Sequence, residues 1–321
     1  MKKIAIAIAA VCAMVIGAGG DVKASIVGGA LKGYRINTLV DESRGLFIDE
    51  DGDGVVSVGD YINGVISFRD IGPVGNTTNT NRKVFGIYAL EIIGIDGATI
   101  TAGAISDTSN ANENSLNNIL SNSNIVANGL STGANSTLAL IESNDGTEVA
   151  LGSLDVTSGF VSGGAVGGLL GSSFTNVLVG GIKSNSDYYA ITLDGSNPLG
   201  AGKSVTNLAD LAAGAPLSAD KEFASYDLGF TVEAHAFGSD VTFSKLGNSN
   251  GVGTSDIVTA GNNSILALTA GVNSDKGWHF ADDGDFYVRP VPEPSTIAIW
   301  AALGLGGCGL VARRRMKAKK A

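Results

Sequence analysis

The stretch that decides the fold is Val84-Phe85-Gly86-Ile87-Tyr88-Ala89-Leu90-Glu91-Ile92-Ile93. Its β-branched and aromatic residues, with a single charged side chain among them, are typical of a β-strand. Similar runs recur along the chain, at Ser136–Glu142, Tyr188–Leu193, Phe230–Phe237, Asp240–Lys245 and Ser264–Leu268. These repeated strand signals predict a body that is mainly β.

Doublets of Asp or Asn with Gly separate many of these runs. They occur at residues 96–97, 128–129, 145–146, 194–195 and 250–251, and they tolerate the positive φ that hairpin turns need. Only Ser115–Leu120 and Val205–Ala213 have the spacing of short helices. We therefore expect an antiparallel, β-sandwich-like body. Its 266 residues, 25–290, are enough for one large domain or two ordinary ones.

The N-terminus has the features of an export signal. A short basic start, Met1-Lys2-Lys3, precedes an almost wholly apolar run from Ile4 to Ala18. Val22-Lys23-Ala24 then places small residues where a signal peptidase reads them. Residues 1–24 are therefore predicted to be a signal peptide with a helical apolar segment, the alternative being a retained anchor.

The C-terminus contains a second hydrophobic segment. Residues 297–312 carry no charge, and with Ser295 and Thr296 they are just long enough, as a helix, to cross a hydrocarbon core of about 30 Å. Six cations crowd the last nine residues, and a basic cluster of this kind stays on the cytoplasmic side. We expect a transmembrane helix at about 295–312, with the preceding body outside.

Three features of this tail occur in a fixed order: Pro292-Glu293-Pro294, the apolar span and Arg313-Arg314-Arg315. In that order they resemble the PEP-CTERM sorting signal. The resemblance implies that residues 291–321 are a removable address, recognised near Pro-Glu-Pro by an exosortase, a membrane protease of bacteria that make exopolysaccharide. It also implies a place in the cell envelope or extracellular matrix after transient membrane anchoring. An ordinary C-terminal anchor is the alternative.

Both cysteines, Cys12 and Cys308, lie in the terminal segments, so the exported body has no disulfide and no thiolate ligand. Three of the 21 Lys and Arg precede Ser25 and six follow Val311. The chain between these two residues therefore has twelve Lys and Arg and thirty Asp and Glu. Its net charge of about −18 argues against nucleic acid as a partner and favours divalent cations.

The strongest chemical signal is the loop Asp49-Glu50-Asp51-Gly52-Asp53-Gly54-Val55-Val56-Ser57-Val58-Gly59-Asp60. A calcium loop needs oxygen ligands at positions 1, 3, 5, 7, 9 and 12, with Gly at position 6 for the turn. The residues at the ligand positions are Asp49, Asp51, Asp53, Val55 through its carbonyl, Ser57 and Asp60. The pattern predicts a structural Ca²⁺ site, and an acidic solvated loop is the alternative.

Asp60 departs from the Glu usual at position 12, and its shorter side chain predicts weaker binding, at about 10⁻⁴ to 10⁻³ M. With Val56 and Ser57 before it, the loop resembles one calcium loop of a dockerin domain. Dockerins usually have two loops, each followed by a helix, and this chain has one. Residues 61–68 favour a strand over a helix because they are β-branched and contain Gly64.

Two classes of function remain from the sequence. The first is a structural or adhesive protein of the cell surface or exopolysaccharide matrix, with the polysaccharide or other matrix proteins as partners. The second is a secreted hydrolase that needs only two carboxylates, such as a glycosidase. The chain has only two histidines, His235 and His279. No residue pattern indicates a catalytic site, so we expect no enzyme.

Overall fold

The computed structural model describes residues 27, 30–31, 35–105, 112–121, 125, 128–161, 174–183, 187–193, 204, 206–213, 224–237, 241–247, 253–259, 265–266, 276–282 and 284–292. The predicted signal peptide, residues 1–24, and the predicted transmembrane span, residues 295–312, lie outside these ranges. Two of the predicted turns, at 194–195 and 250–251, lie outside them as well.

Three long antiparallel strands form the centre of the fold: β1 (Asn37–Ile48), β2 (Tyr61–Pro73) and β3 (Thr78–Asp96). The hydrogen-bonded register joins Ile48 to Tyr61 across β1 and β2, and Tyr61 to Glu91 across β2 and β3. The strand expected at residues 61–68 is confirmed, and it continues to Pro73.

The sheet branches at β3, because different parts of this strand pair with different neighbours. Its middle part pairs with β5 (Ser136–Ser143), and its last part pairs with β4 (Thr99–Gly103). The branches continue through β6 (Phe174–Gly181) and β7 (Tyr188–Leu193), and both reach β8 (Ala224–His235). Two routes of paired strands therefore join β3 to β8.

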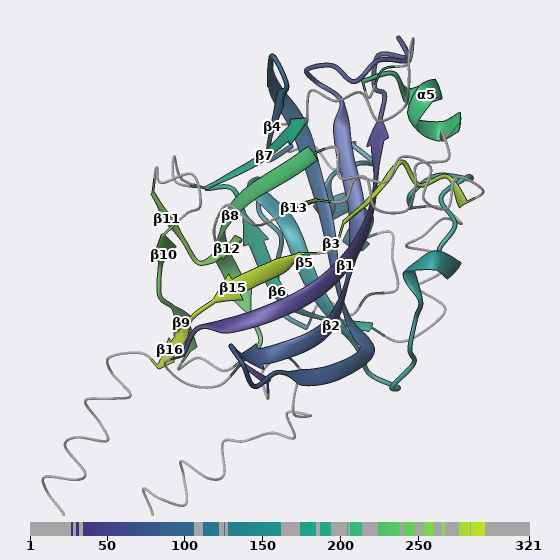
Figure 1. Ribbon diagram of the computed structural model, residues 1–321. Helices are drawn as coiled ribbons and strands as arrows, with labels where there is room; N and C mark the ends of the chain where they lie inside the picture. The colour runs from purple at the N-terminus through teal and green to yellow at the C-terminus, as the bar shows by residue number, and fades with distance from the viewer. Residues whose placement is uncertain are drawn as a thin grey trace, which may run out of the picture.

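The sheet then closes on itself. β12 (Ile257–Thr259) pairs with β8 on one side and with β15 (Asp285–Val288) on the other, and β15 pairs with β1. Every pairing is antiparallel, so the expected mainly β, antiparallel body is confirmed. The expected sandwich of two sheets is wrong in detail, because continuous hydrogen bonding makes one curved, closed sheet (Figure 1).

The remaining strands are short. β13 (Ile265–Leu266) extends β8, and β14 (Phe280–Asp282) pairs with β1. Two separate ribbons pair β9 (Val241–Phe243) with β16 (Pro290–Pro292) and β10 (Leu246–Gly247) with β11 (Thr254–Ser255). The described helices are α3 (Leu116–Ser121), the 3₁₀ turn η1 (Leu151–Ser153) and α5 (Leu208–Ala213). Short helices at both expected places are thus confirmed.

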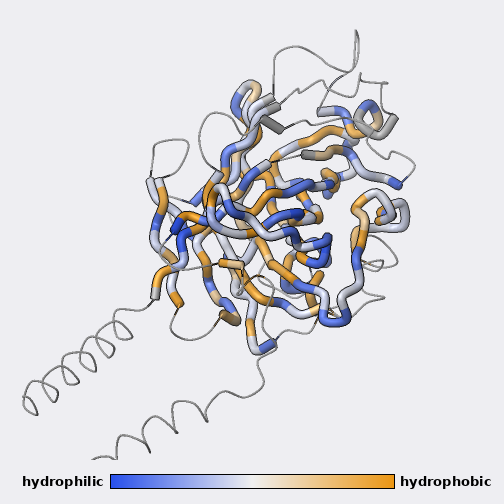
Figure 2. Tube along the Cα trace, turned by 60° about the horizontal axis from the view of Figure 1, so that its bottom comes forward, coloured by the Kyte–Doolittle hydropathy of each residue, from blue (hydrophilic) through white to orange (hydrophobic). Residues whose placement is uncertain are grey.

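Alternation along β3 places apolar side chains in two cores. Tyr88, Leu90 and Ile92 face the inside of the closed sheet, where they meet apolar side chains of β1, β5 and β8. Phe85, Ile87 and Ala89 face the outside, where α3 and the segment around η1 cover them. Because both faces of β3 are buried, its sequence is a nearly continuous apolar run. Apolar stretches run along the strands through the body (Figure 2).

Two glycines make room for aromatic rings at the centre of the sheet. Gly45 of β1 lies directly opposite Gly64 of β2. A Cβ at Gly64 would lie 2.2 Å from the Tyr88 ring, and one at Gly45 would lie 2.2 Å from the Phe280 ring. The glycine that interrupts the second strand in the sequence is therefore a site of close packing.

Candidate functional site

The predicted cation loop, residues 49–60, joins β1 to β2 at the end of the body beside α5 (Figure 1). Gly52 and Gly54 have φ of 77° and 78°, a conformation that glycine adopts without strain. The amide of Val56 donates to the carbonyl of Thr206 at 2.7 Å, and the amide of Leu208 donates to Gly54 at 3.0 Å. The loop is thus attached to the segment that leads into α5.

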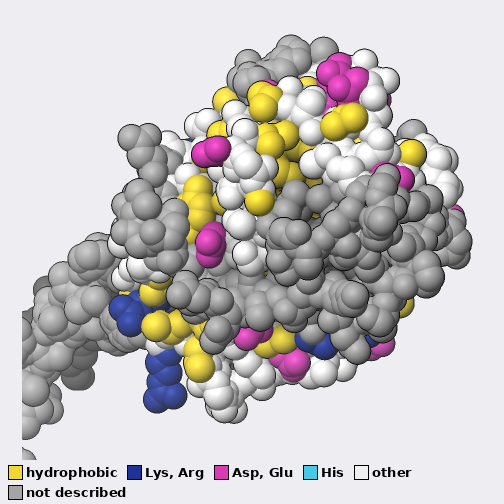
Figure 3. Space-filling model, turned by 45° about the horizontal axis from the view of Figure 1, so that its top comes forward, with side chains coloured by type: hydrophobic (Ala, Val, Ile, Leu, Met, Phe, Trp, Pro, Cys, Tyr) yellow, Lys and Arg dark blue, Asp and Glu magenta, His cyan; other side chains and the backbone are white. Residues whose placement is uncertain are grey.

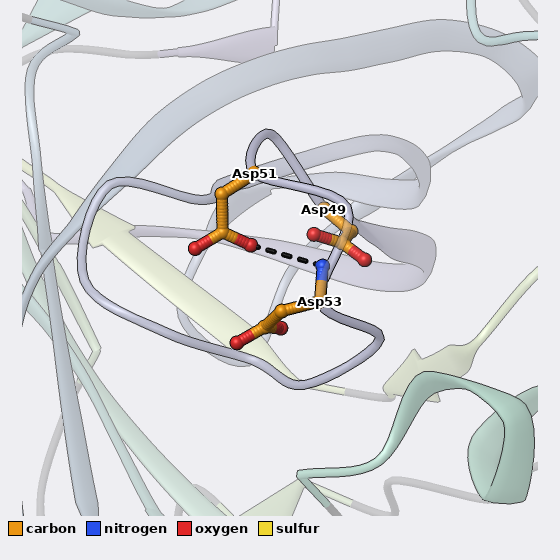
Figure 4. Close-up of side chains that lie close together, drawn as sticks. All are labelled: Asp49, Asp51 and Asp53. Carbon is orange, nitrogen blue, oxygen red and sulfur yellow. Dashed lines mark hydrogen bonds between the residues drawn. The ribbon is translucent and has the colours of Figure 1, made fainter.

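Three of the predicted ligands lie together, as Figure 4 shows. Asp49, Asp51 and Asp53 each offer a carboxylate oxygen, and these atoms all lie within 4.8 Å of one another. The Asp49 carboxylate accepts the amides of Gly52 at 2.6 Å and Gly54 at 2.7 Å. Backbone hydrogen bonds therefore aim this side chain into the loop.

The other two carboxylates are oriented by the same kind of bond. Asp51 accepts the amide of Asp53 at 3.1 Å, and Asp53 accepts the amide of Val55 at 2.7 Å. Asp51 and Asp53 are exposed, whereas Asp49 is half-buried. The loop thus holds three oxygen donors near one point, and oxygen donors are what a hard cation binds.

Electrostatics distinguish the members of this cluster. The hydrogen bond from the Gly54 amide lowers the pKa of Asp49. The Asp53 amide acts in the same direction on Asp51, but desolvation and the negative charges of Asp53 and Asp49 outweigh it and raise the pKa of Asp51. The repulsion among these carboxylates is a cost that a bound cation would remove.

Asp60, the predicted ligand at position 12, lies apart from this cluster. Only 1% of the residue is exposed, and its two oxygens accept the amides of Glu50 at 3.0 Å and Ser57 at 2.6 Å. Asp60 therefore ties the two ends of the loop together. Val55 is positioned by an isolated bridge to Asn207, and Ser57 by its bond to Asp60.

Apolar side chains are exposed beside the acidic cluster. Val58 is 61% exposed and Val55 is 38% exposed, although both belong to the loop. Figure 3 shows acidic and apolar side chains next to one another at this end of the molecule.

The start of the C-terminal tail is part of the folded body. In β16, Val291 pairs with Thr242, and the Ser244 amide donates to the carbonyl of Arg289 at 2.8 Å. In an antiparallel ladder, hydrogen-bonded pairs alternate with pairs that are not hydrogen-bonded. Pro290 and Pro292 lie in the second kind of pair, so their lack of a backbone N–H costs the ribbon no hydrogen bond. Of the predicted motif, Glu293, Pro294, Arg313, Arg314 and Arg315 lie outside the described residues.

The two histidines and the Trp278 segment serve packing. His235 stacks on Phe237 with ring centroids 5.4 Å apart. Trp278 is fully buried, and its indole N–H donates to the carbonyl of Leu154 at 2.8 Å. His279 accepts the amide of Phe47 at its Nδ1 at 3.1 Å, and burial lowers the pKa of its imidazole.

The structure also shows a polar network that sequence patterns do not indicate. Asp187 accepts hydrogen bonds from Ser255 Oγ at 2.7 Å and from Thr231 Oγ1 at 2.8 Å. Lys245 donates to the same Thr231 oxygen at 3.0 Å and pairs with Asp256 at 3.1 Å. These residues are far apart in the sequence and follow no motif, so only the folded sheet brings them together.

Residues 290–315 match the PEP-CTERM protein-sorting motif. Proteins with this motif are exosortase substrates, and the match supports an exported protein located in the cell envelope or outside the cell. The match includes Pro292-Glu293-Pro294 and the three arginines at 313–315. No curated protein and no solved structure matches the chain. Within the part of the chain that the structure describes, none of the helices has the length and apolar character to span a membrane.

Proposed function

We propose that the protein is a structural or adhesive component of the cell surface or of an exopolysaccharide matrix. The observation that carries this proposal is the sorting motif, which begins within the folded body itself. Pro290, Val291 and Pro292 belong both to the matched motif and to β16. The body is therefore the delivered part, and the tail from Glu293 onward is its address.

Two buried carboxylates are bound by neighbouring residues of the fold, which supports a structural role over that of a carboxylate-dependent hydrolase. The Glu233 carboxylate accepts the hydroxyl of Ser136 and pairs with Lys183 at 3.2 Å. Asp256 accepts the amide of Val232 at 2.9 Å and pairs with Lys245. Their oxygens join strands and loops to one another, whereas a glycosidase needs two carboxylates directed at a substrate.

In this proposal Ca²⁺ supports the loop between β1 and β2. Asp49, Asp51 and Asp53 supply carboxylate oxygens, with the Val55 carbonyl and the Ser57 hydroxyl as further donors. Asp60 holds the ends of the loop rather than acting as an inner ligand. Calcium would neutralise the cluster and stiffen the link to the segment before α5.

The tail is proposed to act in two steps. The apolar span at 295–312 holds the exported protein at the membrane while the arginines at 313–315 remain inside. The exosortase then cuts near Pro-Glu-Pro and releases the body to the surface, where matrix polysaccharide or other matrix proteins are its partners.

Thermal melting with and without calcium tests the cation site. For residues 25–292, calcium at about ten times its dissociation constant should stabilise the protein by about 1.4 kcal/mol, and chelator should reverse the gain. The Asp49→Asn, Asp53→Asn variant should lose the response. The Asp96→Asn, Glu148→Gln variant makes the same change in net charge away from the loop and should keep it.

The calcium proposal is wrong if the wild-type midpoint ignores both calcium and chelator. It is equally wrong if both double variants respond to calcium as the wild type does, because the gain would then come from general screening of acidic charge.

A further inference from the structure

A small apolar surface lies at the end of the sheet where the sorting tail begins. The register pairs Asn37, the first residue of β1, with Pro73 of β2 and with Val288 of β15. One residue beyond these pairs, the amide of Val74 donates to the carbonyl of Ile36 at 3.2 Å. Val74 is 59% exposed and Ile36 is 37% exposed. Two neighbouring aliphatic side chains are therefore open to solvent close to β16.

Two arginines flank these side chains. Arg35 is exposed and precedes Ile36, and Arg289 is half-buried and joins β15 to β16. Neither arginine has an ion pair with a described residue. Every described lysine, by contrast, is in a salt bridge: Lys83, Lys183, Lys245 and Lys276. We call Arg35, Ile36, Val74 and Arg289 the tail-end patch.

The length of the tail places this patch close to the membrane while the protein is tethered. β16 ends at Pro292, and only Glu293 and Pro294 separate it from the predicted span at 295–312. Even the four residues before the uncharged run at 297 extend to at most about 14 Å. The headgroup layer on each side of a bilayer is about 5 to 8 Å thick. The end of β16 therefore lies at most about 10 Å outside the lipid headgroups.

The chemistry of the patch fits an anionic lipid surface. Arginines are attracted to anionic headgroups, and aliphatic side chains gain free energy by entering the boundary between headgroups and acyl chains. The nearby Asp256 opposes this little, because it pairs with Lys245 at 3.1 Å.

The acidic loop at 49–60 is too distant to repel the lipid. β1 runs for 12 residues, about 40 Å, from the patch to that loop, which lies at the opposite end of the body from β16 (Figure 1). Salt screens charges that are more than about 10 Å apart. The negative net charge of the body therefore does not decide what this end of the molecule contacts.

We propose that the tail-end patch rests on an anionic lipid surface while the tail tethers the protein. This arrangement requires the membrane span of the proposed function. Ile36 and Val74 enter the headgroup layer, and the two arginines pair with lipid phosphates. The body is then held with its acidic loop away from the membrane and with Pro-Glu-Pro at the membrane surface, where a membrane protease can cut.

Fluorescence quenching in liposomes tests this arrangement on the full chain. Cys12→Ser and Cys308→Ser leave one introduced cysteine for a bimane label, either Val74→Cys or Val58→Cys. These two valines are matched in exposure, at 59% and 61%, and lie beyond opposite ends of β1. The chain is reconstituted in phosphatidylglycerol liposomes that contain a lipid with a nitroxide on its headgroup. The nitroxide should quench the Val74 label at least about fivefold more than the Val58 label, which β1 holds away from the membrane.

Removal of the unpaired cations locates the contact. Arg35→Gln with Arg289→Gln should lower quenching of the Val74 label at least about twofold, since each cation near the surface contributes to lipid binding. Lys83→Gln with Lys276→Gln makes the same change in net charge at paired side chains and should leave the quenching as in the wild type. Replacing phosphatidylglycerol by phosphatidylcholine should lower the quenching of the wild-type label as well, and this comparison needs no arginine variant to fold. Equal quenching in the two lipids and in both double variants would overturn the proposed lipid contact.

Flotation separates failure of this lipid contact from failure of the proposed function. A chain that does not float with the liposomes lacks a membrane span, which overturns both. A chain that floats but shows equal quenching of the two labels is anchored without the predicted face on the lipid, which overturns the lipid contact alone. Protection of the Val74 label from aqueous iodide without quenching by the nitroxide would show that a second copy of the protein covers the patch, and would also overturn it.

Discussion

At the scale of single residues, the molecule uses small and polar side chains to fit large aromatic ones. Gly45 and Gly64 face each other across two strands and leave space for the rings of Phe280 and Tyr88. Trp278 closes the outer core and satisfies its indole N–H on Leu154. Packing rather than strand propensity therefore decides which residues occur at these positions.

Gly64→Ala tests this close packing. The new methyl carbon would lie 2.2 Å from the Tyr88 hydroxyl oxygen and 2.6 Å from the Arg44 carbonyl oxygen, so ring and backbone must both move. We expect a loss of about 3 kcal/mol in the free energy of unfolding, measured by urea denaturation. Gly247→Ala is the control, because nothing lies within 4 Å of its added carbon. It should change stability by no more than about 0.5 kcal/mol.

His279 makes stability depend on pH. Burial lowers its pKa in the folded protein, whereas the unfolded value is about 6.5. The unfolded chain therefore binds more protons between the two values, and the stability present above pH 6.5 is lost as the pH falls towards the folded pKa. The slope should be at most about 1.4 kcal/mol per pH unit, measured by denaturation at a series of pH values.

His279→Asn supplies the control for this effect. The Asn oxygen can accept the Phe47 amide in place of Nδ1 but cannot be protonated, so the slope between pH 7 and 5 should become shallower. An unchanged slope in the His279 variant would show that other groups cause the dependence.

At the scale of elements, sequence patterns locate strands better than they locate strand ends. β7 has the expected bounds, Tyr188–Leu193, because an apolar run ends there. β3 extends beyond the expected residues 84–93 to Thr78–Asp96, since its polar ends pair with β2 and β4. β1 was not expected, because polar residues such as Asp41 and Ser43 interrupt its apolar pattern and yet are buried inside the sheet.

Some contacts of the candidate site can likewise be predicted from the sequence, and others cannot. The cluster of Asp49, Asp51 and Asp53 follows from local sequence, since two-residue spacing within one loop brings the carboxylates together. The bond between Ser255 and Asp187 joins residues that are 68 positions apart in the sequence. No periodicity or motif encodes such contacts, so they required the structure.

The ribbon of β9 and β16 gives a prediction at this scale. Thr242→Pro removes the backbone donor opposite Val291 and should free the start of the sorting motif from the body. We expect faster limited proteolysis near residues 289–292 and altered kinetics of tail removal in cells. Thr242→Val keeps the backbone amide and loses only the hydroxyl contact to Val291 at 3.3 Å, so its cleavage rate should match that of the wild type. Equal rates in the two variants would mean that the ribbon does not protect this segment.

At the scale of the whole molecule, closure of the sheet explains how the body does without disulfides. The sheet encloses one apolar core and covers a second with α3 and its neighbours. Closure depends on β12, three residues long, meeting both β8 and β15. Strand propensity alone could not show this, because the pairing joins segments from the middle and the end of the chain.

The proposed function requires that the protein is exported and separated from its sorting tail. The most direct test is the intact mass of the mature protein recovered from the cell surface and the medium. We expect a chain that begins at Ser25 and ends near Pro292 or Glu293, without the span and the three arginines. A mature surface protein that still contains Arg315 would contradict removal of the tail, and one that begins at Met1 would contradict cleavage of the signal peptide.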